Sequence, residues 1–157
     1  MNAINTDALV AMRDAVPSHM HEKTWALQTA LLNMPQFEPP TEHIFHGGMY
    51  CRKVSIPAGC TLVGKVHKKE HFFALASGSI CVTTDEGPQL LTGFKLLSSY
   101  PGTKRAIHAV SDSVFMTFHA TDLTDVEQVE QALVEEDTAS TFTTGNKLKP
   151  FELEVSL

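Results

Sequence analysis

Two histidines, His67 and His71, are the residues best placed to act together in this sequence, and Lys68, Lys69 and Glu70 separate them. In one straight strand their Cα atoms would lie about 13 Å apart, too far for a shared metal ion with Zn–N bonds of about 2 Å. A tight turn at the three intervening residues would instead place the two side chains opposite each other across a hairpin. The spacing therefore predicts a metal site, with Glu70 as a possible further ligand, only if the chain turns here. Otherwise the segment is a solvated loop with two nearby histidines.

A third histidine from a later strand would complete such a site. In the run SVFMTFHA, His119 shares one strand face with Phe115 and Thr117. In the run KRAIHAV, alternation turns His108 outward if Arg105 faces inward, unless a bulge reverses the order. We therefore predict a site of His67, His71 and His119 for one divalent ion, Zn, Ni or Fe, and keep His108 as the alternative third ligand. The alternative interpretation of His119 is a residue that binds no metal and only makes a hydrogen bond near the end of its strand.

Two adjacent cations, Lys104 and Arg105, suit an anionic ligand. The guanidinium of arginine is a planar fork that binds carboxylate or phosphate with two parallel hydrogen bonds. Tyr100 could orient such a ligand, although a tyrosine before a turn is more often a packing residue. The competing interpretation of Arg105 is a salt bridge to Glu86, to Asp112 or to an acid on a helix.

Helical patterns occupy the start of the chain. Residues 6–16 have apolar side chains at helical spacing up to Pro17, and Ser18 can cap a second helix over 18–33. The proline-rich stretch 35–43 follows as an extended connector.

The pattern changes at about Ile44 to short β-prone runs separated by turn residues, as in an all-β barrel or sandwich. The runs are MYCRKVSI, CTLVGKV, HFFALA, SICVTT, PQLLTGFKLLS, KRAIHAV and SVFMTFHA. Helical spacing returns after Asp122, where Thr124 and Glu127 form a capping box and Val129 and Leu133 belong to an apolar stripe. The tail from Thr138 includes Glu-Leu-Glu-Val, which could add a strand or be mobile.

The turn residues and histidines resemble the motifs of the cupin superfamily. The strings are PAG, GKVHKKEHFFALASG and YPGTKR. Aligned on Gly78, the resemblance places His67 on the second histidine of the first cupin motif, Lys65 on the first and His71 on the acid. Arg105 takes the place of the histidine in the second motif. Only one of the usual four ligands thus agrees in type, and a standard three-histidine, one-glutamate site cannot be carried over.

The resemblance implies a mostly β fold, an antiparallel double-stranded β-helix (jelly-roll barrel) flanked by N-terminal and C-terminal helices. We divide the chain into a helical segment 1–43, a barrel 44–121 and a helix with tail 122–157. The strings are also similar to small cupin-like proteins of bacteriophages, which implies a phage origin and adds no mechanism. Cupin resemblance also implies a homodimer, and the leading helices, with Trp25, Leu27 and Leu31, could form its interface.

Length and composition limit the classes of protein. The chain has 157 residues, 43% hydrophobic and 19% charged, as in one globular domain, and a net charge of −6 that argues against nucleic acid or anionic membrane as partners. The odd set of three cysteines without CxxC spacing predicts reduced thiols. The N-terminus carries acids where a signal peptide needs an apolar core. We expect a cytoplasmic protein, in the host cytoplasm if it is phage-encoded.

Three functions remain open. The first is a metal-dependent enzyme acting on a small anionic substrate held by Arg105. The second is a metal-free protein that binds or sequesters a small anionic metabolite or signal. The third is a structural scaffold. The fold alone cannot choose between them.

Overall fold

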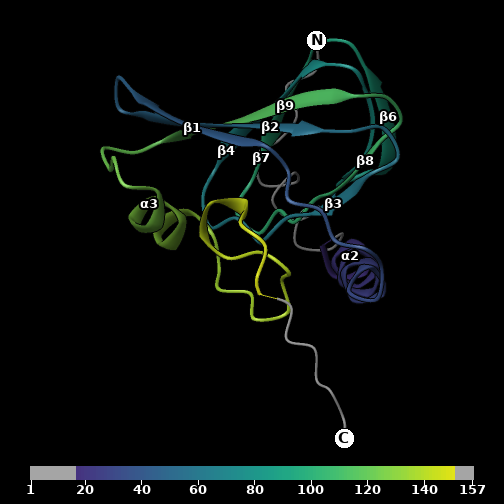
Figure 1. Ribbon diagram of the computed structural model, residues 1–157. Helices are drawn as coiled ribbons and strands as arrows, with labels where there is room; N and C mark the ends of the chain where they lie inside the picture. The colour runs from purple at the N-terminus through teal and green to yellow at the C-terminus, as the bar shows by residue number, and fades with distance from the viewer. Residues whose placement is uncertain (1–16, 151–157) are drawn as a thin grey trace, which may run out of the picture.

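The computed structural model describes residues 17–150, and its strands enclose the core of the molecule (Figure 1). The predicted helix at 6–16 and the predicted strand within 151–157 lie outside the described residues. The strands of the described part are β1 Thr41–His46, β2 Met49–Ile56, β3 Thr61–Val63, β4 His71–Ser77, β5 Ser79–Thr84, β6 Gly87–Thr92, β7 Lys95–Ser99, β8 Ala106–Ala109 and β9 Ser113–Ala120.

The strands form two antiparallel sheets whose order identifies a jelly roll. One sheet has the order β1-β2-β9-β4-β7 and the other β3-β8-β5-β6. The antiparallel pairs β2/β9, β3/β8, β4/β7 and β5/β6 correspond to one long hairpin, with its tip between β5 and β6, that has been rolled up. This is the jelly-roll arrangement of two Greek keys, so the predicted antiparallel barrel is confirmed.

The strand boundaries follow from alternation and from turn glycines. The runs MYCRKVSI, SICVTT and SVFMTFHA are strands over their full predicted length. The run PQLLTGFKLLS was wrong as a single strand, because Gly93 turns the chain at a φ of +69° and separates β6 from β7. The barrel also begins earlier than residue 44, since the end of the proline-rich connector pairs with β2 as strand β1.

Alternating residues of both sheets meet in the core. Leu75 and Ile80 are fully buried at 0% exposure, and each contributes about 1.5–3 kcal/mol by leaving water. Gly78 lies at the corner between them with a φ of +92°, where an added Cβ would collide with Ser113 and with the backbone of Asp112. A residue with a side chain would therefore force this corner apart.

Two helices and the C-terminal segment lie outside the barrel at one end (Figure 1). Helix α2, Pro17–Leu31, already includes Ser18, so the predicted Ser18 cap is wrong. Helix α3 is Val126–Leu133, and its N-cap is Asp125, which accepts a hydrogen bond from the amide of Gln128. The predicted capping box at Thr124 was therefore one residue early.

Helix α3 buries Val129 and Leu133 against Tyr50 of β2, as its apolar stripe predicts. The chain then continues past the end of the barrel as residues 138–150, which contain the short 3₁₀ helix η1, Thr144–Asn146. We call residues 138–150 the C-terminal strap.

Helix α2 leaves apolar surface uncovered, since Trp25 and Leu27 are each 37% exposed. The homodimer stays a prediction.

The three cysteines are free and half-buried. No helix in the described part of the chain has the length and apolar character to cross a bilayer.

Candidate functional site

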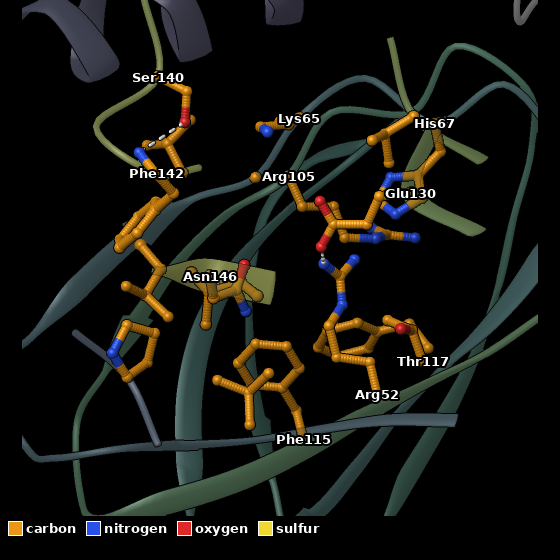
Figure 2. A pocket seen from close by; sticks show the side chains of 18 of the residues that line it. Arg52, Lys65, His67, Arg105, Phe115, Thr117, Glu130, Ser140, Phe142 and Asn146 are labelled. Carbon is orange, nitrogen blue, oxygen red and sulfur yellow. Dashed lines mark hydrogen bonds and ion pairs between the residues drawn. The ribbon is translucent and has the colours of Figure 1, made fainter. Parts of the chain in front are cut away.

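A cavity of about 90 Å³ lies inside the barrel at the end covered by α3 and the C-terminal strap (Figure 2). Its apolar wall comes from both sheets and the strap, and its polar groups include three cations and one carboxylate. The polar lining consists of Arg52, Lys65, His67, His71, Arg105, Thr117, Glu130, Ser140, Thr143 and Asn146. In Figure 2, Arg52, Glu130 and His67 lie together on one side, whereas Phe142 lies on the opposite side.

The three predicted histidines meet beside this cavity. The ring centroids of His67 and His71 are 4.2 Å apart, those of His71 and His119 4.6 Å, and those of His67 and His119 5.6 Å. His119 is 2% exposed and faces inward with Thr117, as alternation along β9 predicts. The sequence therefore placed all three imidazoles correctly in one cluster.

The predicted reason for this proximity was wrong. His67 and His71 do not face each other across a hairpin, because β3 and β4 belong to different sheets. His67 lies in the connection between the sheets, where its backbone bonds to Thr103 and Gly102 and bridges to Val134. The crossing of the chain from one sheet to the other brings the two rings together.

Burial in this environment favours the neutral form of all three imidazoles. Burial, followed by the positive charge of neighbouring groups, lowers the pKa of His67 well below its ordinary value and that of His119 to about 3. Burial also lowers the pKa of His71, although a hydrogen bond with the Lys69 carbonyl opposes the shift. Arg52 lowers the pKa of all three and Arg105 that of His71, so both guanidinium groups act electrostatically on the cluster.

The hydrogen bonds of the cluster leave one ring without partners. His71 Nδ1 lies 3.1 Å from the carbonyl oxygen of Lys69, and His119 Nε2 lies 3.0 Å from the hydroxyl of Thr117. Both ring nitrogens of His67 are buried and make no hydrogen bond of good geometry within residues 17–150, although the nearby Thr103 backbone raises the pKa of the ring. A buried polar atom without a partner costs about 1–3 kcal/mol, so His67 has unused capacity for a bound group.

A metal ion fits the donor types of the cluster but not its arrangement. The rings are stacked, with interplanar angles of 8–29°, and a metal lies in the plane of each imidazole that binds it. The rings would have to turn before their nitrogens faced one point. Accordingly, no group of three or more His, Cys, Asp or Glu within residues 17–150 is arranged to hold a metal ion. The metal role of the histidines stays a prediction.

Two arginines give the cavity its positive charge. Arg52 lies 3.6 Å from Glu130 of α3, and Glu130 also accepts a hydrogen bond of 2.8 Å from the amide of Gly145 in the strap. Arg105 donates to the carbonyl of Thr83 and to the hydroxyl of Ser99. Burial lowers the pKa of Arg105, yet a guanidinium remains charged near neutral pH.

No carboxylate among residues 17–150 lies within ion-pair distance of Arg105, and its buried Nε–H has no acceptor. The expected alternative, a salt bridge to Glu86, Asp112 or a helix acid, is therefore not formed within this part of the chain. Arg105 is thus a half-buried cation with a buried Nε, and no carboxylate of the described residues forms an ion pair with it.

Four other predicted site residues lie elsewhere. Lys104 is buried and does not line the cavity, because its Nζ bonds to Asp137 and to the carbonyl of Gly64. His108 is exposed and bonds to Thr61, because β8 has no bulge that would turn it inward. Tyr100 is 40% exposed at a turn, and Glu70 is exposed in the loop before β4; neither lines the cavity. The predicted site therefore loses four residues. Lys104 and Tyr100 do not lie where they were expected to bind the ligand, and His108 and Glu70 do not lie where they were expected to bind the metal.

Sequence reasoning missed Arg52 and Glu130. Alternation along β2 could have found Arg52, because it places this residue on the same face as Tyr50, Val54 and Ile56. Glu130 had no comparable signal, because it follows Val129 in a helix rich in acids and its contact with the strap depends on tertiary structure.

Comparisons with known proteins give distant likenesses. No family model matches the sequence, and no curated protein matches it. Similar solved structures include a cupin superfamily protein from Desulfitobacterium hafniense, with 12% identity, a TM-score of 0.47, and coverage of 59% of this chain and 86% of that one. KdgF from Halomonas sp. has 11% identity, a TM-score of 0.49 and coverage of 56% and 84%. The cupin domain of Cnp3 from Schizosaccharomyces pombe has 19% identity, a TM-score of 0.47 and coverage of 59% and 72%. Because all three TM-scores are below 0.5, the fold assignment rests on the strand order of the molecule itself.

Proposed function

We propose that the barrel binds a small molecule that carries an anionic group and an apolar body, without a metal ion. The observation that carries this proposal is Arg105, a half-buried guanidinium that lines the cavity, has a buried Nε without an acceptor, and forms no ion pair with a carboxylate of the described residues. A buried charge is costly unless it is paired, and a bound carboxylate or phosphate would supply the missing partner. Lys65 adds positive charge at the same cavity, whereas the charge of Arg52 is offset by its ion pair with Glu130.

The walls of the cavity suit an apolar body. They are formed by aliphatic and aromatic side chains of both sheets and of the strap, namely Val54, Leu62, Phe73, Ile107, Phe115 and Phe142. Ligand sites of this kind are mostly apolar and fix the orientation of the ligand by a few polar groups.

The protonation state of the histidines favours binding over acid–base catalysis. An efficient general base has a pKa near the working pH, whereas burial lowers the pKa of His119 to about 3 and that of His67 well below its ordinary value. The unpartnered nitrogens of His67 are better suited to a hydrogen bond with the ligand. The similarity of the sequence strings to bacteriophage proteins extends the proposal: the ligand would then be a metabolite or signalling molecule of the host.

Isothermal titration with benzoate and with phenyl phosphate tests the proposal. Replacing the guanidinium in Arg105→Met should weaken binding about 10- to 100-fold, since hydrogen bonds to charged groups contribute about 1.5–3 kcal/mol. Lys95→Met, which removes one exposed positive charge on β7, is the matched control and should bind as the unmodified protein does. Binding that is equal in Arg105→Met, or no binding of either anion, would overturn the proposal.

The second candidate is a metal-dependent enzyme, and the partnerless nitrogens of His67 favour it. It requires that His67, His71 and His119 rotate to face one ion. Elemental analysis of protein purified without an affinity tag should then find stoichiometric Zn, Ni or Fe that His67→Ala abolishes and Arg105→Met retains. The metal-free proposal predicts no stoichiometric metal in this measurement.

A further inference from the structure

A second cavity, of about 180 Å³, lies beside the first, between α2, β3 and the C-terminal strap. The two cavities have four lining residues in common: Leu62 and Val63 of β3, and Ser140 and Phe142 of the strap. These side chains are therefore a shared wall, with one cavity on each side.

The shared wall includes one aromatic side chain, Phe142, that belongs to the strap. Phe142 is half-buried, packs on the barrel core, and is held by the strap rather than by a strand of either sheet. Figure 2 shows it on the side of the first cavity opposite Arg52 and Glu130. Rotation of this ring about its side-chain bonds would join the two spaces without a change in the barrel.

The two cavities differ in chemistry. The basic groups Arg52, Lys65 and Arg105 line the first cavity, and no Lys, Arg, Asp or Glu of the described residues lines the second. Beyond the shared wall, the second cavity presents the apolar side chains of Leu31, Met34, Phe37 and Cys60 together with the uncharged polar residues Gln28, Gln36, Thr61 and Thr141. Charged groups at one end and an uncharged surface with an apolar strip at the other is a pattern that an amphiphile complements.

We propose that the two cavities form one channel for an amphiphile, whose anionic head group binds at Arg105 and whose hydrocarbon chain passes Phe142 into the second cavity. This inference rests on the proposed function and adds the ligand class, an unbranched carboxylate with an apolar chain. It also identifies Phe142 as a residue that determines how long a ligand the protein accepts.

Straight-chain carboxylates from butanoate to decanoate test the channel. Affinity should rise with chain length by up to about fourfold per buried methylene group. Leu31→Trp places a larger side chain in the second cavity and should abolish this gain while leaving butanoate binding unchanged. Leu32→Trp, the adjacent exposed residue that does not line the cavity, should preserve both.

Alkylation of Cys60 with iodoacetamide reports directly on the second cavity, because this thiol lines it. Decanoate should slow the modification of Cys60 and butanoate should not, while Cys81, which lines neither cavity, is modified at an unchanged rate. Arg105→Met should lose most of the protection at the same decanoate concentration, because the head group anchors the chain.

The outcomes separate this inference from the proposed function. If butanoate binding depends on Arg105, but decanoate binds no more tightly and leaves Cys60 equally reactive, the channel is wrong and the anion site stands. Undiminished protection of Cys60 in Arg105→Met would mean that the second cavity binds apolar chains independently, which overturns the single channel. If no carboxylate binds, both proposals fail.

Discussion

Lys104 and Arg105 are neighbours in the chain, and both are cations removed from water, but their surroundings are opposite. The Nζ of Lys104 lies 3.3 Å from Asp137, donates a 2.9 Å hydrogen bond to the Gly64 carbonyl, and sits 3.9 Å above the ring of Trp25. The side chains of this ion pair are 0% and 5% exposed. Every contact that a buried ammonium needs is supplied by the protein.

Arg105 has hydrogen bonds to Thr83 and Ser99 but no carboxylate within ion-pair distance among residues 17–150. Burial lowers its pKa, and the negative charge of Asp85, which lies beyond ion-pair distance, opposes this shift. The comparison shows how a structural cation differs from one available to a ligand. The first is neutralised inside the fold, whereas the second is fixed in position by neutral acceptors and retains an unpaired charge at a cavity. The sequence alone did not distinguish the two residues, and both were predicted to bind an anionic ligand.

The largest expected effect is on stability, at Lys104. Lys104→Met leaves the buried carboxylate of Asp137 without its cation and should lower the free energy of unfolding by about 3–5 kcal/mol in urea denaturation. Lys53→Met breaks only an exposed ion pair with Glu42 and should change it by less than about 1 kcal/mol. Equal effects of the two substitutions would show that the Lys104 pair is not a structural element.

The second prediction concerns the histidines around the cavity, which should make the free energy of unfolding depend on pH. The pKa values of His67 and His119 in the folded state lie below the unfolded value of about 6.5, so at acidic pH the unfolded chain binds protons that the folded chain does not. The free energy of unfolding should therefore fall as the pH drops below about 6.5, by about 1.4 kcal/mol per pH unit for each histidine. For His119 the loss should continue down to about pH 3.

Urea denaturation at a series of pH values measures this slope. His119→Gln should make it shallower by about 1.4 kcal/mol per pH unit between pH 6 and 4. His108→Gln, at an exposed histidine on β8, is the control and should leave it unchanged. An equally steep slope in His119→Gln would mean that this imidazole is not buried in the neutral form.

The smallest effect on stability is expected at Arg105. Because only neutral acceptors, the Thr83 carbonyl and the buried Ser99 hydroxyl, lose a donor when it is removed, Arg105→Met should lower the free energy of unfolding by no more than about 1–3 kcal/mol, less than Lys104→Met does. The same variant should lose anion binding. A loss of several kcal/mol would place Arg105 with Lys104 among the structural cations and remove the basis for the proposed site.

Much of the barrel could be predicted because its signals are local. Strict alternation marked β2, β5 and β9, and turn residues marked most of their ends. The errors fall where local patterns compete. Pro39 and Pro40 hid the start of β1, and neighbouring residues Thr124 and Asp125 were both able to cap α3.

The candidate site was predictable only in part, because its members come from separate elements. The two histidines near β4 and His119 on β9 could be brought together by motif and alternation. The partners of Lys104 and Arg105 could not be predicted from the sequence, because they depend on where Asp137 and the C-terminal strap pack after the barrel has formed. Whether a charge is paired is a property of tertiary structure.

A crystal structure of the protein with 4-bromobenzoate would show whether Arg105 binds the anion, because the bromine marks the position of the ligand. We expect the carboxylate at hydrogen-bond distance from the guanidinium of Arg105 and the bromine toward Phe142. A carboxylate bound only to exposed lysines, or a metal ion held by His67, His71 and His119 with the ligand on it, would rule out the proposed anion site.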